Sequence, residues 1–118
     1  MPKLTKYGII LDTSVGSTST VTDPISIIPN NKIIRLTGFG GYDPVGSDGV
    51  AGIISLQWGS GTTWQTVRAG GYGAFDFQWE RGIEFAGDGA KRFRIVRQNR
   101  SSVAKVMVAW LTGKLVKE

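Results

Sequence analysis

The chain has 118 residues, a formal net charge of +5, 17 glycines and four tryptophans, and it contains neither cysteine nor histidine. This length and an apolar content of 41% fit one folded domain with one hydrophobic core. Without cysteine there is no disulfide scaffold, thiolate nucleophile or cysteine zinc site, and without histidine there is no Ser-His-Asp triad. We therefore expect a protein that is not an enzyme and that uses no cofactor or metal.

The sequence contains no segment suited to a membrane. No stretch reaches the roughly 18 to 20 apolar residues that a membrane helix requires. The N-terminus begins with basic residues, but the apolar run at residues 8–11 ends at Asp12 and is too short for a signal peptide. We expect a soluble protein that is made in a cytoplasm and has no membrane partner.

Charge is distributed unevenly along the chain. Residues 91–118 hold eight basic side chains and one acidic one, whereas residues 1–90 hold six basic and eight acidic side chains. A basic segment of this kind fits an acidic protein surface or a nucleic acid, and it also fits a solvated strand face that keeps a small protein soluble. Among partners, an acidic protein surface is the one we expect.

Strand patterns and turn residues alternate along the whole chain, and no window of a dozen residues has the spacing of an amphipathic helix. A long loop is predicted for residues 40–52, which contain several turn sequences. The clearest alternation, at residues 74–80, predicts a half-buried strand. The predicted strands, in chain order, cover residues 3–11, 18–28 with a break at Asp23-Pro24, 32–39, 53–58, 64–68, 74–80, 82–85, 92–98 and 103–115.

Residues 92–98 alternate between apolar and basic side chains. Phe93 lies on the apolar face, and Arg92 and Arg94 point to the opposite face. Arg97 shares the Phe93 face at the end of the strand, where it can border the core. No exposed aromatic residue accompanies these arginines in the pattern, so we do not expect them to bind nucleic acid by base stacking.

The last predicted strand, residues 103–115, is apolar on both faces. Val106, Val108 and Trp110 share one face. The other face is formed by Met107, Ala109 and Leu111. A strand of this kind is central in a sandwich or is covered by another subunit. Met107, Ala109 and Leu111 are therefore candidates for a subunit interface.

The four tryptophans exceed what one small core needs. Trp58, Trp79 and Trp110 fall on apolar strand faces, which predicts that they lie in the core. Trp64 lies beside a glycine-rich turn and has weaker periodic support. It is a further candidate for the subunit interface or for a platform on which a sugar stacks, and a place in the core fits it equally well.

The pattern of short strands, with turns every eight to twelve residues, predicts an all-β protein. We expect an antiparallel β-sandwich of jelly-roll type with seven to nine short strands, while an immunoglobulin-like strand order also remains open. Residues 15–118 form the single sandwich domain, and residues 1–14 form an N-terminal arm or a first strand.

The search for catalytic or ligand-binding motifs finds none. The glycine-rich stretches at residues 38–41 and 87–91 lack the spacing of a phosphate-binding loop and predict turns instead. Asp76 and Glu80 share a strand face, but four residues of strand separate them by about 13 Å, which is more than glycosidase carboxylates allow. No acidic segment follows the pattern of a calcium-binding EF-hand loop.

The order of features along the chain resembles one known group of proteins. These features are the Ser/Thr-rich segment 17–22, the Pro-Asn-Asn-Lys turn 29–32, the strand 33–39, the Gly-Asp-Gly turn 87–89 and the long valine-rich last strand. In this order they resemble the small jelly-roll proteins of tailed bacteriophage virions, especially the head-decoration (cement) proteins.

The resemblance implies a homo-oligomer, most simply a trimer, on the outer capsid lattice of a virion assembled in the host cytoplasm. Such a protein binds and stabilises neighbouring subunits of the major capsid protein, here through an acidic capsid surface. The candidate capsid contacts combine the N-terminal segment with the basic C-terminal third and are Lys3, Lys6, Tyr7, Arg92, Arg94 and Arg97.

The alternative is a carbohydrate-binding or tail-associated adhesion module of a phage, because jelly rolls also serve as lectins. In that case the loops at residues 40–52 and 59–63 would form a shallow sugar site with Tyr42 and Trp64.

Overall fold

A computed structural model of the chain describes residues 4–44, 49–71 and 73–117. Within these residues the chain forms ten β-strands and no helix, which confirms the expected all-β fold. The strands, in chain order, are β1 (Leu4–Leu11), β2 (Ser14–Val15), β3 (Thr20–Pro24), β4 (Lys32–Asp43), β5 (Ile53–Ser60), β6 (Thr63–Gly70), β7 (Gly73–Ala86), β8 (Arg92–Gln98), β9 (Lys105–Val106) and β10 (Val108–Lys117).

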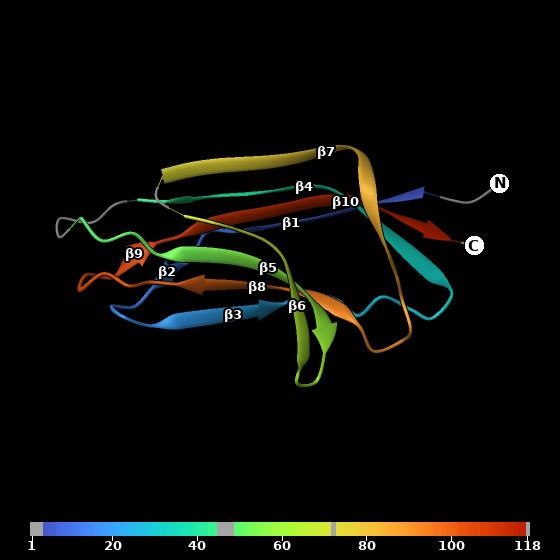
Figure 1. Cartoon of the computed structure of the whole chain (residues 1–118), viewed down its shortest axis with the longest axis horizontal. Coiled ribbons are helices and arrows are strands. Elements are labelled where there is room, and N and C mark those ends of the chain that lie inside the picture. Colours follow the sequence, from blue (N-terminus) through green and yellow to red (C-terminus); the bar gives the residue numbers. More distant parts are fainter. Residues whose placement is uncertain (1–3, 45–48, 72, 118) are drawn as a thin grey trace.

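Eight of these strands form two four-stranded sheets that stack as a sandwich (Figure 1). One sheet has the order β1-β10-β4-β7 and the other has the order β3-β8-β5-β6. All pairings are antiparallel, and each sheet combines strands from distant parts of the chain. This order is that of a jelly roll, in which two Greek keys wrap around one core, and it confirms the predicted fold class. The short strands β2 and β9 pair with each other at one end of the sandwich (Figure 1).

The core lies between the two sheets, because each strand buries every second side chain. Trp58 lies in this core, and Trp79 packs partly against it, as the sequence predicts. Phe93 contacts Trp58 at a ring-centroid distance of 4.7 Å. The buried apolar residues are Val15, Ile25, Ile28, Ile34, Leu36, Phe39, Ile54, Leu56, Trp58, Phe93, Ile95, Met107, Ala109 and Leu111.

Strand β4 is longer than predicted and runs to Asp43, so the predicted loop begins four residues too early. Gly40 and Gly41 read as loop residues in the sequence, yet both pair with β10 on one side and β7 on the other. A Cβ atom on Gly40 would overlap the ring of Trp110. Glycine is therefore used here for close approach of a neighbouring side chain rather than for a turn.

Strand β7 joins the two strands predicted at residues 74–80 and 82–85 into one strand of 14 residues. Its pairing with β4 shifts register between Leu36 and Gly38, and Gly82 has a positive φ of 78° in the same region. A bulge of this kind bends a strand without ending it. Figure 1 shows β7 curving at this point toward the second sheet.

Met107, Ala109 and Leu111 are fully buried between the sheets, so they are not available to a second subunit. This corrects the expected subunit interface. The opposite face of β10 points outward and holds Val108 and Trp110, so Trp110 lies half-buried on the surface of the sheet rather than in the core. With apolar residues on both faces, the alternation in the sequence could not indicate which face points inward.

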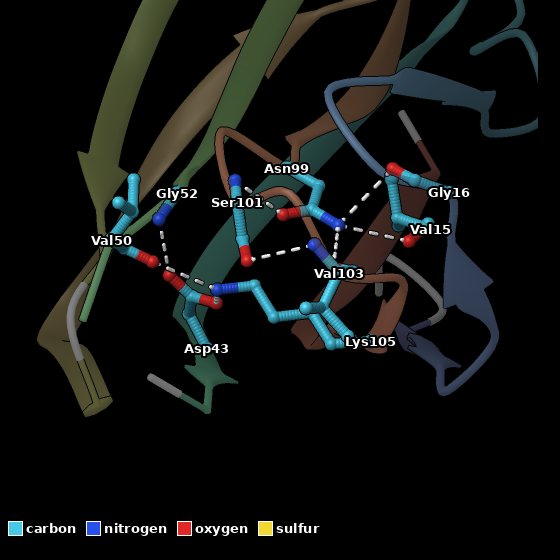
Figure 2. Close-up of polar contacts among 9 residues, drawn as sticks. All are labelled: Val15, Gly16, Asp43, Val50, Gly52, Asn99, Ser101, Val103 and Lys105. Atoms are coloured by element: carbon cyan, nitrogen blue, oxygen red, sulfur yellow. Dashed lines mark hydrogen bonds and ion pairs between the residues drawn. The ribbon is translucent and has the colours of Figure 1, made fainter. Parts of the chain in front are cut away.

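A buried amide joins the segment at Val15 and Gly16 to the loop between β8 and β9 at one end of the sandwich (Figure 2). The Nδ2 atom of Asn99 lies within 3.1 Å of the carbonyl oxygens of Val15, Gly16 and Val103, to which it donates. The Asn99 Oδ1 atom accepts the backbone N–H of Ser101 at 2.9 Å. A buried side chain with its donors and acceptor all used holds irregular backbone without a desolvation penalty.

An ion pair beside this amide fixes the connection between β4 and β5 (Figure 2). Lys105 Nζ lies 2.8 Å from Asp43 Oδ1, and both side chains are buried. Asp43 Oδ2 accepts the Gly52 N–H at 2.6 Å, and Lys105 also donates to the Val50 carbonyl at 3.3 Å. The pair therefore attaches β9 to both ends of the segment that follows β4.

Replacing Lys105 with methionine should lower the free energy of unfolding by about 3 to 5 kcal/mol, because it leaves the Asp43 carboxylate buried without its cation. Urea denaturation followed by tryptophan fluorescence measures this change. Lys114→Met, at an exposed position on β10, should change the free energy of unfolding by less than about 0.5 kcal/mol. Equal losses in the two variants would contradict a stabilising role for the ion pair.

A tight turn at Asp88 connects β7 to β8. Asp88 Oδ1 accepts the backbone N–H groups of Lys91 at 2.7 Å and of Ala90 at 2.9 Å. These two hydrogen bonds, that of Lys91 first, lower the pKa of Asp88 below its ordinary value of 3.8. The same turn joins the segment before β4, since Gly89 N–H donates to the Ile28 carbonyl at 3.2 Å.

The lowered pKa predicts a stabilising contribution from Asp88 that is present above pH 3.8 and is lost as the pH falls through the lower pKa of the folded state. Asp88→Asn removes the charge at every pH. The wild-type protein should therefore be the more stable of the two at pH 6, and the difference between their urea midpoints should shrink at pH 2.5. A difference that stays constant over this range would contradict the assignment.

Candidate functional site

The outward face of the β3-β8-β5-β6 sheet brings together two predicted capsid contacts, Arg92 and Arg94, and a predicted subunit-interface residue, Trp64. Arg92 and Arg94 lie on β8, opposite Gly59 and Gln57 of β5. Gly59 in turn lies opposite Trp64 of β6. A Cβ atom on Gly59 would overlap the backbone of Thr63 and Trp64, so glycine allows β5 and β6 to approach closely in this row. We call Arg92, Arg94, Gln57 and Trp64 the arginine–tryptophan face.

The side chains at the centre of this face are held in place by one another. The guanidinium carbon of Arg94 lies 3.9 Å from the ring centroid of Trp64, a cation–π contact. Arg94 Nε donates to Gln57 Oε1 at 2.6 Å, and Trp64 Nε1 donates to the Gly61 carbonyl at 2.8 Å. All three side chains are half-buried, so their positions are set before any partner binds.

Arg92 is held in a similar way, since its Nε atom donates to the Ile25 carbonyl at 2.6 Å. In both arginines the inner Nε is used, and no hydrogen bond or ion pair joins their terminal Nη atoms to any residue that the structure describes. Terminal guanidinium nitrogens in this state can bind a carboxylate or phosphate through two parallel hydrogen bonds. The face is therefore chemically suited to an anion.

Strand alternation explains why two of the three candidate arginines point outward. Phe93 and Ile95 are fully buried, which turns Arg92 and Arg94 to the opposite side of β8. The half-buried aromatic neighbour was missed in the sequence because Trp64 lies on a strand about 30 residues earlier. The contact between Trp64 and Arg94 follows only from the register of β8 with β5 and the register of β5 with β6.

Arg97 follows the same alternation into the interior and does not join this face. Its side chain is 1% exposed. Its terminal nitrogens donate to the carbonyls of Thr13 and Met107 at 2.9 and 2.8 Å and form an ion pair with Asp23 at 3.0 Å. This corrects its assignment as a capsid contact: Arg97 borders the core, and its guanidinium joins the segment before β2, the strand β3 and Met107, the residue between β9 and β10.

The N-terminal candidates lie on the other sheet or outside the described residues. Lys3 falls outside the residues that the structure describes. The backbones of Lys6 and Tyr7 belong to β1 and pair with Lys114 and Gly113 of β10. Because β1 and β8 belong to different sheets, the structure does not bring Lys6 and Tyr7 onto the arginine–tryptophan face.

The outward face of the β1-β10-β4-β7 sheet has a different chemistry. Ile10 lies opposite Trp110, and Tyr42 lies opposite Val108, so the four side chains form one patch across three strands. Ile10 is 73% exposed and Tyr42 is 47% exposed. Gly40 on β4 lies opposite Trp110 of β10 and has no side chain, so the patch is flat at this point. We call Ile10, Tyr42, Val108 and Trp110 the apolar face.

The sugar site considered for the adhesion alternative does not form. Tyr42 lies on the outward face of one sheet, and Trp64 lies on the outward face of the other. The segments before β5 and after β5 are separated by the length of that strand and lie at opposite ends of the sandwich (Figure 1). The sequence placed Tyr42 and Trp64 in one sugar site because it does not show that their strands belong to different sheets.

Neither a metal cluster nor a membrane-spanning helix is found in the described part of the chain. Residues 4–44, 49–71 and 73–117 contain no group of three or more acidic, histidine or cysteine side chains placed to hold a metal ion. The same residues contain no helix long and apolar enough to cross a membrane. The arginine–tryptophan face and the apolar face are the two candidate surfaces.

Comparison with known proteins shows a similarity in fold. No protein-family model matches the sequence, and no curated protein matches it. Among solved structures, the chain is similar to a chain of Desmodium yellow mottle tymovirus, with a TM-score of 0.52 and 9% sequence identity. The match covers 99% of this chain and 87% of the viral one. At this identity the likeness shows the fold alone, which is a β-sandwich of the kind found in viral capsids.

Proposed function

We propose that this chain is a non-enzymatic structural protein of a virus particle and acts as a capsid decoration protein. In this role it binds an acidic surface of the outer capsid lattice through the arginine–tryptophan face. It contacts further copies of itself through the apolar face, most simply as a trimer. The host and the particle are those of a tailed bacteriophage, as the resemblance in sequence features suggests.

The observation that carries this proposal is the pair of outward faces on a capsid-type jelly roll. One sheet presents two arginines whose terminal nitrogens have no hydrogen bond or ion pair to the residues that the structure describes, and the other presents an exposed apolar patch. A protein that binds both its own copies and a foreign lattice requires two such surfaces of different chemistry. The viral likeness supports the setting, although one fold can serve many functions and does not select this one.

The apolar face favours an oligomer over a monomer. Four neighbouring apolar side chains on the adjacent strands β1, β10 and β4 leave a contiguous hydrophobic surface in contact with water. In an antiparallel sandwich, each sheet has one face in the core and one face outward, and this patch lies on an outward face. Its burial against further copies would leave the arginine–tryptophan face of every copy free for the capsid.

An antibody raised against the purified chain should label the outer surface of intact, gradient-purified particles in immunogold electron microscopy. The particles come from cells that produce this chain, and an antibody against an unrelated protein of the same cells is the control. Label on the capsid shell supports a decoration protein. Chain that is absent from the particles and remains in the soluble fraction would contradict the proposed function.

Ile10→Lys should convert the oligomer to a monomer, because it places a charge on the most exposed residue of the apolar face. Multi-angle light scattering at micromolar concentration measures the mass, which is 12.7 kDa for one copy. Val103→Lys is the matched control, since Val103 is 47% exposed but lies outside the apolar face. A wild-type chain that is already monomeric, or an unchanged mass for Ile10→Lys, would contradict the proposed interface.

A further inference from the structure

We infer that the indole ring of Trp110 and the polar side chains beside it form a binding site for a neutral sugar ring. The site shares Trp110 with the apolar face, so a bound sugar and a second copy of the chain compete for this surface. The sugar site goes beyond the proposed function, whereas the competition rests on it. The site differs from that of the adhesion alternative, because Trp64 takes no part in it.

The Trp110 ring lies across β4 instead of standing up from the sheet. Trp110 of β10 is paired with Gly40 of β4. A Cβ atom on Gly40 would overlap the Cζ2 and Cε2 atoms of the indole, so the ring occupies the space of the missing side chain. One surface of the ring therefore covers the glycine, and the other points outward. A flat aromatic surface of this kind can pack against the C–H groups on one face of a sugar ring.

Polar side chains of β7 border this ring. Asp76 is paired with Gly40 on the side opposite to β10, so Asp76 and Trp110 flank the same glycine. Gln78 Nε2 donates to Asp76 Oδ1 at 2.6 Å, which orders the two side chains with respect to each other. The carboxylate and the amide therefore stand as a fixed pair at the β7 side of the indole.

A second pair of polar groups meets over the next outward glycine of β4. Gly38 is paired with Gln78 of β7 and with Thr112 of β10. The point at which a Cβ atom of Gly38 would lie is 2.7 Å from Thr112 Oγ1 and 3.1 Å from Gln78 Nε2. Thr112 Oγ1 also lies 3.3 Å from Thr37 Oγ1. Glycine at both positions thus lets an aromatic ring and a row of polar groups lie side by side on the sheet.

These polar groups match the hydroxyls of a sugar. Asp76 Oδ2 and Gln78 Oε1 have no hydrogen bond or ion pair to any residue that the structure describes, and both can accept hydroxyl protons. The Thr112 hydroxyl can donate as well as accept. Small-molecule sites generally combine an apolar surface with a few polar groups that fix orientation. A sugar stacked on Trp110 would use both.

The charge of the border favours a neutral ligand. Asp76 and Glu80 are exposed on the outward side of β7, so a sugar acid or a nucleotide would bring a second negative charge next to the Asp76 carboxylate. The exposed cation Lys114 lies four residues from Trp110 on β10, beyond Thr112. A neutral pyranose is the ligand class that satisfies the ring and the carboxylate together.

A second copy of the chain uses the same surface in a different way. Its apolar side chains would cover Trp110 and Ile10, while Asp76 and Gln78 remain in water at the rim of the interface. A sugar uses the ring and the polar border at once. Because both ligands need the outer surface of Trp110, binding of one excludes the other.

Methyl β-D-glucopyranoside is the probe, since its ring substituents are all equatorial and leave both C–H faces flat. It is titrated into the full-length ¹⁵N-labelled chain while the indole N–H signals are followed by NMR. We expect the Trp110 signal to shift with millimolar affinity, and the signals of Trp58 and Trp64, which belong to the other sheet, to stay in place. Sorbitol, which has similar hydroxyls but no ring, should cause no shift at the same concentration.

The matched variants are Asp76→Asn and Glu80→Gln. D76N should weaken binding of the glucoside at least threefold, because a carboxylate is the stronger acceptor of a hydroxyl proton. E80Q removes an exposed charge from the same strand and should leave the affinity unchanged. Dispersed amide spectra establish that both variants are folded. An unshifted Trp110 signal in the wild-type chain, or equal affinities of wild type and D76N, would overturn the sugar site.

Multi-angle light scattering in saturating glucoside measures the competition. The mass should fall toward the 12.7 kDa of one copy, and sorbitol should leave it unchanged. A shifted Trp110 signal with an unchanged oligomer mass would overturn the competition.

These outcomes separate the inference from the proposed function. If the chain is an oligomer and the glucoside does not shift Trp110, the proposed self-contact stands and the sugar site is wrong. If the glucoside shifts Trp110 in a chain that is monomeric at every concentration, the sugar site is supported and the proposed self-contact is wrong.

Discussion

The burial of Phe93 and Ile95 between the two sheets is the constraint on which the candidate site depends. A strand that places one set of alternate side chains in the core must present the other set to solvent. Arg92 and Arg94 therefore point outward, and the same alternation sends Arg97 inward. Three arginines within six residues of β8 thus have two roles, which their common charge in the sequence conceals.

The polar contacts at the β2–β9 end complement this core. Asn99 and the pair of Lys105 with Asp43 hold the irregular segments of that end with buried, satisfied groups. The two faces differ in chemistry, one basic and one apolar, and this difference supports a protein that contacts two kinds of neighbour.

Much of the fold could be predicted from the sequence, because its alternating strands and turn residues are local signals. The alternation of Phe93 with Arg92 and Arg94 gave both the strand and its outward face. The outward face of β10 could not be predicted, since both of its faces are apolar and only packing decides between Met107 and Val108. The contact between Arg94 and Trp64 depends on the pairing of three strands, for which no local signal exists.

The central claim is that the β3-β8-β5-β6 sheet, through its arginines, is the side that faces the capsid. A cryo-electron microscopy map of particles carrying the chain tests this most directly, since the jelly roll can be oriented in the density by its sheets. We predict that Arg92 and Arg94 lie at the contact with the capsid lattice, next to acidic side chains of the partner. A map in which the arginine–tryptophan face points to solvent, while the apolar face rests on the lattice, would contradict the claim.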